Sequence, residues 1–199
     1  MDINELYKYV QNNIPHGRVY LRPAEVQLLA GYVSGAIGDH VEIGTLWGGS
    51  AIIAALAKRD ADRSEMVITI DSMDTKFWLE GDPMGLGIPT LDKVIDNFNF
   101  FNVMNEIVLM AAKSFPWPLP LSNRFGTAFI DGDHHTDSVR QDFYSAGAIA
   151  PILLFHDYDP QHKIHKTGVV ETLDQLVAQH QDEWERVEHT ETILVVRRR

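Results

Sequence analysis

Two short clusters of acidic residues and histidines are the part of this chain with the clearest capacity for chemistry. Each cluster follows directly on an apolar run of the kind that forms a buried strand. Their members are Asp131, Asp133 and His134 after residues 127–130, and His156, Asp157 and Asp159 after residues 151–155. Carboxylate oxygens with an optional imidazole suit Mg²⁺ or Mn²⁺ better than a thiol-loving metal. A divalent ion held here would bind a substrate hydroxyl and lower its pKa.

A glycine-rich turn is the second feature that predicts ligand binding. It lies between an expected strand at 41–43 and an expected helix that begins at about Ser50. Gly44 and Gly48 let the backbone turn without a Cβ and approach a ligand closely. The first amides of the helix offer a partly positive site for an anionic group. The turn therefore predicts a nucleotide-like cofactor.

Two carboxylates accompany this turn, one just before it and one at the end of the next expected strand. Glu42 lies in an otherwise apolar strand, where a buried charge needs a partner such as loop amides or the ammonium group of a cofactor. Asp71 ends the apolar run 66–70, and at the carboxyl edge of a sheet it can accept hydrogen bonds from both hydroxyls of a ribose. The spacing Glu42-x-Gly44-x-x-x-Gly48 differs from the Gly-x-Gly-x-x-Gly of dinucleotide-binding folds. The spacing therefore counts against a nicotinamide cofactor.

This acid-and-glycine motif, with the acid after the second strand, resembles the class I S-adenosylmethionine-dependent methyltransferases. The resemblance covers the chain from about Arg22 to the end. Within that class, the runs 129–134 and 153–157 are similar to the metal-dependent sugar O-methyltransferases and, more distantly, to catechol O-methyltransferase. The resemblance implies a three-layer, Rossmann-like α/β fold with a seven-stranded, mostly parallel sheet whose last strand is antiparallel.

The resemblance also implies roles for individual residues. S-adenosylmethionine is the implied cofactor, and its implied binding residues are Glu42, Gly44, Gly48, Ser50, Asp71, Ser72, Ser114 and Asp131. The implied ligands of a Mg²⁺ or Mn²⁺ ion are Asp131, His156 and Asp157. The implied catalytic residues are Asp131 and His134, with His134 placed to take the proton of a hydroxyl group. Metal-dependent relatives commonly have a second carboxylate where this chain has His156.

Three functions remain open from the sequence. The first is metal-assisted O-methylation of a small hydroxylated molecule such as a sugar, a phenol or a natural product. The second is a methyltransferase-like protein that has lost catalysis, or keeps the cofactor only as a ligand, and acts through partners. The third is a nicotinamide-dependent oxidoreductase, against which the middle of the chain also lacks an obvious Ser/Tyr-x-x-x-Lys pair.

The elements that must position these residues alternate along the chain. Helices are predicted at 23–33, from about 50 to 57, and at 91–98, 138–150 and 169–179. Strands are predicted at 41–43, 66–70, 106–110, 127–130 and 151–155, and a closing hairpin at 184–189 and 192–196. This order is typical of an open, mostly parallel α/β sheet. We expect one domain over 1–199, with a helical extension at 1–20 and a loop at 72–90 that is either a lid over the substrate or an ordinary surface loop.

Composition restricts the partners and the compartment. A formal charge of −11 at pH 7 disfavours nucleic acid, whose binders usually carry a basic face. The absence of cysteine excludes disulfides and thiolate zinc sites. Residues 1–5 do not begin a signal peptide, and no apolar run approaches the roughly 20 residues of a membrane span, so we expect a cytoplasmic protein. The basic run 197–199 is interpreted as a solvated tail, and apolar residues near the N-terminus are a candidate homodimer surface.

Overall fold

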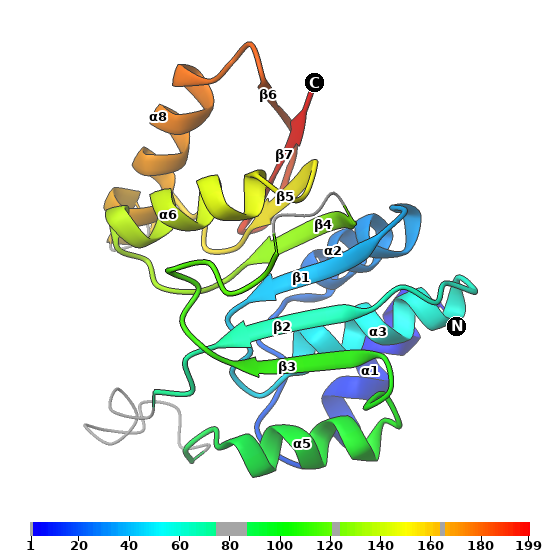
Figure 1. Ribbon diagram of the computed structural model, residues 1–199. Coiled ribbons are helices and arrows are strands. Elements are labelled where there is room, and N and C mark those ends of the chain that lie inside the picture. The colour runs from blue at the N-terminus through cyan, green and yellow to red at the C-terminus, as the bar shows by residue number, and fades with distance from the viewer. Residues whose placement is uncertain (1, 75–86, 121–123, 164–165) are drawn as a thin grey trace.

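Strands and helices alternate in the computed structural model, which describes residues 2–74, 87–120, 124–163 and 166–199 (Figure 1). The strands are β1 (Asp39–Ile43), β2 (Val67–Asp71), β3 (Ile107–Ala111), β4 (Phe125–Ile130), β5 (Ile152–Phe155), β6 (Trp184–Thr190) and β7 (Ile193–Arg198). The helices are α1 (Ile3–Asn13), α2 (Pro23–Gly35), α3 (Gly49–Asp60), α5 (Leu91–Phe100), α6 (Thr136–Gly147), the short π-helix η1 (Lys166–Val170) and α8 (Glu171–Gln179).

The seven strands form one sheet in the order β3-β2-β1-β4-β5-β7-β6. The pairs among β3, β2, β1, β4 and β5 are parallel, whereas β7 is antiparallel to both β5 and β6. The direction of winding reverses between β1 and β4, the place where open α/β sheets form a ligand crevice outside the carboxyl ends of their strands. The predicted sheet, with its single antiparallel last strand, is confirmed.

Helices cover both faces of the sheet and give the three layers that were predicted (Figure 1). Helices α1, α2, α3 and α5 bury apolar residues against one face, where Phe129 and Leu154 point. Helices α6 and α8, with η1, cover the other face, where Ile43 and Phe155 point. Alternate residues of a strand point to opposite faces, so Glu42 points toward the first layer while its neighbour Ile43 points toward the second.

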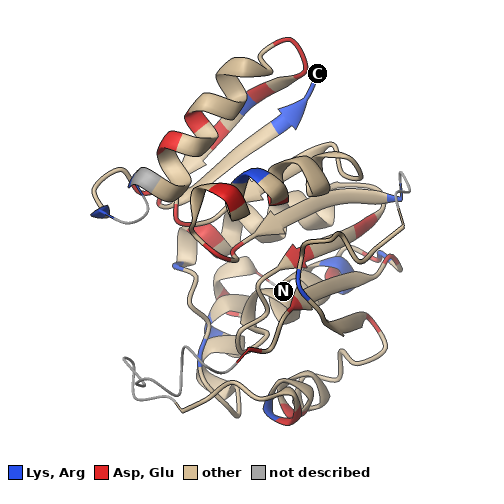
Figure 2. Cartoon of the chain, turned by 60° about the vertical axis from the view of Figure 1, so that its left-hand side comes forward, with Lys and Arg blue, Asp and Glu red and all other residues tan. Residues whose placement is uncertain are grey.

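Most element boundaries agree with the sequence prediction, with two larger differences. The helix predicted at 138–150 begins at Thr136 and ends at Gly147, because the chain must leave the helical conformation before Pro151, which directly precedes β5. The basic run 197–199 begins inside β7, which extends to Arg198, although the side chain of Arg197 is still 53% exposed and pairs with Glu185 on β6 at 2.6 Å. Figure 2 shows these basic residues at the C-terminal end of the strand.

The N-terminal extension and the long loop are described in part. Helix α1 packs against α2 and α3, as its buried residues Leu6 and Val10 require. In the predicted lid at 72–90, residues 75–86 lie outside the described residues. In the part of the chain that the structure describes, no helix is long and apolar enough to cross a bilayer.

Candidate active site

Glu42 is buried between the sheet and the first turn of α3. Its carboxyl group accepts hydrogen bonds from the hydroxyls of Ser50 and Thr69, the latter at 2.7 Å. Burial raises the pKa of Glu42 to about 8, and these two hydrogen bonds only partly offset the effect. Glu42 is therefore protonated at neutral pH. Its partners within the described protein are two hydroxyl groups, and not the loop amides that the sequence offered as one possibility.

The backbone conformation and the close neighbours at positions 44 and 48 both require glycine. Gly44 has φ +95°, and a Cβ at this position would lie 2.0 Å from the carbonyl oxygen of Asp131. Gly48 has φ +78°, and its Cβ would lie 2.4 Å from the ring of Phe98. The turn after β1 therefore passes directly against the start of the loop after β4. This contact brings the predicted cofactor turn next to the first acid–histidine cluster.

We expect Gly44→Ala to lower the free energy of unfolding by about 3 kcal/mol, because the alanine adds left-handed backbone strain to a steric clash. Gly31→Ala is the matched control, since nothing lies within 4 Å of a Cβ at this position in α2. Alanine there should stabilise the helix by roughly 0.5–1 kcal/mol. Urea unfolding of the two variants measures both effects. Equal stability of the two variants would contradict the close approach of the loops.

Asp71 at the end of β2 fixes the glycine-rich turn. One carboxylate oxygen accepts hydrogen bonds from the amides of Thr45 at 2.9 Å and Leu46 at 3.1 Å, and the other from the amide of Met73 at 2.8 Å. An ionised carboxylate has about four acceptor positions. Three are thus occupied by backbone amides, and one is left open. The side chain of Ser72 accepts a hydrogen bond from Asp74 at 3.3 Å.

Trp47, beside the glycine turn, belongs to the core. It is buried, and its ring packs against the backbone at Gly17, where a Cβ would lie 2.2 Å from the ring. Asn97 holds the turn by donating to the carbonyl oxygens of Trp47 and His16. The Trp47 ring therefore packs in the core beneath the glycine turn, and it does not line the solvent-facing side of the turn.

Ser114, beyond the end of β3, pairs with a buried carboxyl group on α6. Its hydroxyl hydrogen-bonds to Asp142, and burial raises the pKa of Asp142 to about 6. A Cβ at Gly132, in the loop after β4, would lie 3.6 Å from the same carboxyl group. Ser114 is therefore brought close to the loop that follows β4. Asp142 was not identified from the sequence, because an acidic residue in an amphipathic helix usually faces solvent.

The raised pKa of Asp142 predicts a pH-dependent effect on stability. The folded-state pKa lies above the unfolded value of 3.8, so Asp142 destabilises the fold increasingly as the pH rises from about 4 to above 6. Asp142→Asn cannot ionise and escapes this loss. We expect the variant to gain up to about 3 kcal/mol over the wild type between pH 4 and pH 7. Chemical denaturation at both pH values measures the gain, and a pH-independent difference would contradict it.

An acid–histidine cluster, which consists of Asp131, His134, His156 and Asp157, forms where β4 and β5 end. Nδ1 of His156 lies 3.1 Å from Oδ1 of Asp131 and 3.4 Å from Oδ2 of Asp157. Nε2 of His134 lies 2.7 Å from the same oxygen of Asp157. Asp157 has φ +58°, which is strained for a residue other than glycine. All four residues that the sequence singled out thus meet at one edge of the sheet.

The charges within the cluster stabilise one another. Burial by itself raises the pKa of Asp157, but hydrogen bonds from His134 and His156 outweigh it and hold that pKa well below its usual range. Burial lowers the pKa of His156, yet Asp131, Asp157 and Glu25 together raise it well above 6.5. The hydrogen bond to Asp157 raises the pKa of His134. Asp157 is therefore an ionised carboxylate that pairs with two imidazoles.

The donor atoms of this cluster fit a divalent cation. One ligand atom each from Asp131, His156 and Asp157 lies within 4.8 Å of the others. Neighbouring ligands of an octahedral ion with bonds of 2.0–2.2 Å lie about 3 Å apart, close to the 3.1 and 3.4 Å separations found here. Two carboxylates and an imidazole are compatible with the Mg²⁺ or Mn²⁺ ion that the sequence suggested.

Asp133 and Asp159, the remaining acids of the two clusters, are engaged locally. Asp133 accepts hydrogen bonds from the amide of His135 and the hydroxyl of Ser138, at the start of α6. Asp159 accepts from the amide of Gln161 at 2.8 Å. Neither belongs to the group of possible metal ligands among the described residues.

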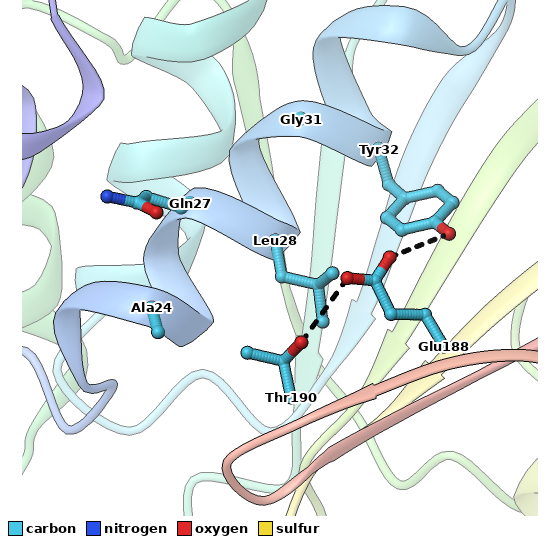
Figure 3. A pocket seen from close by; sticks show the side chains of 7 residues that line it. All are labelled: Ala24, Gln27, Leu28, Gly31, Tyr32, Glu188 and Thr190. Carbon is cyan, nitrogen blue, oxygen red and sulfur yellow. Dashed lines mark hydrogen bonds between the residues drawn. The ribbon is translucent and has the colours of Figure 1, made fainter.

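A surface hollow of about 460 Å³ lies between α2 and β6 (Figure 3). It is lined by Ala24, Gln27, Leu28, Gly31, Tyr32, Glu188 and Thr190. Glu188 accepts hydrogen bonds from the hydroxyls of Tyr32 at 3.4 Å and Thr190 at 3.3 Å, and Gln27 donates to Asn4. These polar groups already have partners, so the hollow offers little to a polar ligand.

The sheet order, the glycine turn and the cluster at the carboxyl ends of β4 and β5 together define a Rossmann-like methyltransferase architecture. Residues 41–158 match the family model described as a methyltransferase domain. This match covers more than half of the chain, and the chain therefore belongs to that family. The predicted methyltransferase resemblance is confirmed, and the oxidoreductase alternative is set aside. The curated proteins contain no significant match.

Solved structures of low sequence identity share the fold. The O-methyltransferase TomG of Streptomyces achromogenes, involved in tomaymycin synthesis and solved with S-adenosylmethionine, has 14% identity and a TM-score of 0.60, covering 100% of this chain and 90% of that chain. An O-methyltransferase of Bacillus cereus in complex with S-adenosylhomocysteine has 16% identity and a TM-score of 0.60, with coverages of 100% and 91%. The S-adenosylhomocysteine-bound methyltransferase PaMTH1 of Podospora anserina has 13% identity and a TM-score of 0.61, with coverages of 100% and 88%.

Proposed function

We propose that this methyltransferase uses S-adenosylmethionine and a divalent cation to methylate the hydroxyl oxygen of a small molecule. The observation that carries the proposal is the set of donor atoms on Asp131, His156 and Asp157, with His134 hydrogen-bonded to the same set. Support for the cofactor comes from the relatives of this fold that were solved with S-adenosylmethionine or S-adenosylhomocysteine. The negative net charge of −11 favours a small acceptor over nucleic acid.

The cofactor would occupy the edge of the sheet between the glycine turn and Asp131. Gly44 and Gly48 keep this edge free of side chains, and the amides at the start of α3 face it. Asp71 has one acceptor position left for a ribose hydroxyl. Ser114 and Ser72 lie beyond the ends of β3 and β2, where they can contact the nucleoside part.

Asp131, His156 and Asp157 would hold the cation, which supplies a Lewis acid that lowers the pKa of a bound hydroxyl group. His134 takes the hydroxyl proton, and Asp157 orients the imidazole and stabilises the imidazolium that forms. The acceptor oxygen then forms a bond to the methyl carbon as the carbon–sulfur bond breaks, with S-adenosylhomocysteine as the second product. Because the displacement is direct, the protein contributes mainly alignment, worth about 7–11 kcal/mol.

Methyl transfer to a panel of phenols and sugars tests this proposal. The purified protein is incubated with S-adenosylmethionine and each acceptor, in Mg²⁺, in Mn²⁺ or in EDTA, and both products are quantified. We expect an O-methylated product with at least one acceptor, and its loss in EDTA. Turnover that EDTA leaves unchanged would contradict the metal assistance. Tight cofactor binding without turnover on any acceptor would instead favour the non-catalytic alternative.

A further inference from the structure

Glu25 is a buried carboxylate that reaches the acid–histidine cluster from the other side of His156. It lies in the first turn of α2, with only 1% of its surface exposed, and its Oε2 is 3.7 Å from Nε2 of His156. On the opposite side of the ring, Nδ1 faces Asp131 and Asp157. The imidazole is therefore held between three carboxylates, and only two of them belong to the proposed cation site.

We propose that Glu25 is a positioning residue, which holds the Nε2–H of His156 so that the Nδ1 lone pair faces a divalent cation between Asp131 and Asp157. The inference rests on the proposed function, since it concerns the same cation site. Metal-binding histidines almost always donate their second ring N–H to a carboxylate or carbonyl oxygen, which fixes both the tautomer and the ring orientation. Glu25 lies where such a partner is needed.

The other contacts of Glu25 explain why its carboxylate stays in place. Oε2 accepts a hydrogen bond from the amide of Arg22 at 2.7 Å, and Oε1 accepts from the amide and the hydroxyl of Thr192 at 3.0 and 2.6 Å. Three of the four acceptor positions are thus filled, by the amide of Arg22 just before α2 and by Thr192 on the β6–β7 turn, and the fourth faces His156. Burial raises the pKa of Glu25, but the contact with His156, followed by the hydrogen bonds from Arg22 and Thr192, outweighs burial and lowers this pKa to about 2.

The rigid arrangement also bears on which cation is bound. The ring of His156 is fixed by Glu25 on one edge and packs at 6.0 Å against Phe129, so it cannot swing away without breaking buried contacts. The third ligand is then an imidazole nitrogen, which binds Mn²⁺ more readily than Mg²⁺. Mn²⁺ is accordingly the probe for this site.

We test the inference by measuring Mn²⁺ binding to the full chain of the wild type and two variants. Electron paramagnetic resonance reports the concentration of free Mn²⁺ in each titration. Glu25→Gln places an amide nitrogen among groups that donate hydrogen bonds, and should weaken Mn²⁺ binding about 10- to 100-fold. Thr192→Val removes a hydroxyl that bonds to the same carboxylate but leaves Oε2 beside His156. Its Mn²⁺ affinity should stay within about threefold of the wild type, although its melting temperature falls.

A spectroscopic measurement separates positioning from a purely structural role. In the wild type loaded with Zn²⁺ as a diamagnetic ion, long-range ¹⁵N–¹H spectra should show His156 protonated at Nε2 and metal-bound at Nδ1. In Glu25→Gln the ring should lose this single tautomer. Unchanged Mn²⁺ affinity in Glu25→Gln, or equal weakening in both variants, would overturn the role of Glu25 alone. A wild type that binds no Mn²⁺ would overturn the metal-assisted function and this inference together.

Discussion

Asp131→Asn is expected to weaken Mn²⁺ binding at least about 100-fold and to reduce kcat in proportion. Asp131 supplies the oxygen that lies 3.1 Å from Nδ1 of His156, and asparagine keeps the shape of the side chain while it removes the charge. Replacing a residue that hydrogen-bonds to a metal ligand typically weakens metal binding 10- to 100-fold. Replacing a ligand itself should therefore weaken it at least as much. The amide hydrogen bond from Asp131 to the carbonyl of Ile43 is untouched, so the loop should keep its place.

Asp133→Asn is the matched control for this experiment. Asp133 lies two residues further along the same loop, is 55% exposed, and bonds only to His135 and Ser138 in the contacts described. Its Mn²⁺ affinity and kcat should stay within about threefold of the wild type, as expected for an exposed charge. Equal losses in the two variants would mean that the loop as a whole, and not the oxygen of Asp131, supports activity.

His134→Gln is expected to lower kcat about 10²- to 10⁴-fold, the usual contribution of a positioned general base. Glutamine can still donate a hydrogen bond to Asp157, but it cannot take a proton from the acceptor. Binding of S-adenosylhomocysteine should be unchanged, because the cofactor contacts proposed above lie on the turn after β1, at the start of α3, at or beyond the ends of β2 and β3 and at Asp131, and none of them is His134. Rapid-quench measurement of a single turnover isolates the chemical step.

The neighbouring histidine provides the control for His134. His135 is 88% exposed and pairs with Asp133, so His135→Gln alters the same loop without altering the cluster. It should turn over at close to the wild-type rate. If His134→Gln turned over at the wild-type rate, His134 would not be the general base. The cation would then be the only group left to activate the hydroxyl.

The architecture and the meeting of Asp131 with Asp157 could be predicted from sequence for a simple reason. Strands of a parallel sheet present their carboxyl ends at one edge, so residues that follow adjacent strands must lie close together. The prediction required only that β4 and β5 be neighbours, and their register, Thr127 opposite Ile152, bears this out. Local sequence patterns were sufficient here, because the order of strands in the sheet determines which strand ends, and therefore which residues, are neighbours in space.

Side-chain partners were less predictable, because they depend on contacts between distant segments. Glu25 and Thr192 are 167 residues apart in sequence but share a hydrogen bond, and no local pattern marks either residue as part of the site. The hydroxyl partners of Glu42 and the amides on Asp71 likewise depend on how closely the turn after β1 packs on β2. Asp133 and Asp159, which the sequence placed near the same edge, instead accept hydrogen bonds from groups within five residues of them in sequence.

Calorimetric titration with S-adenosylhomocysteine, and with NAD as the competing ligand, tests the central claim most directly. S-adenosylhomocysteine should bind the wild type with a micromolar Kd, and NAD should not bind. Asp71→Asn should weaken the binding by about 1–3 kcal/mol, the cost of lost hydrogen bonds to a charged group. Absence of S-adenosylhomocysteine binding, or equal binding of NAD, would contradict the assignment of the cofactor.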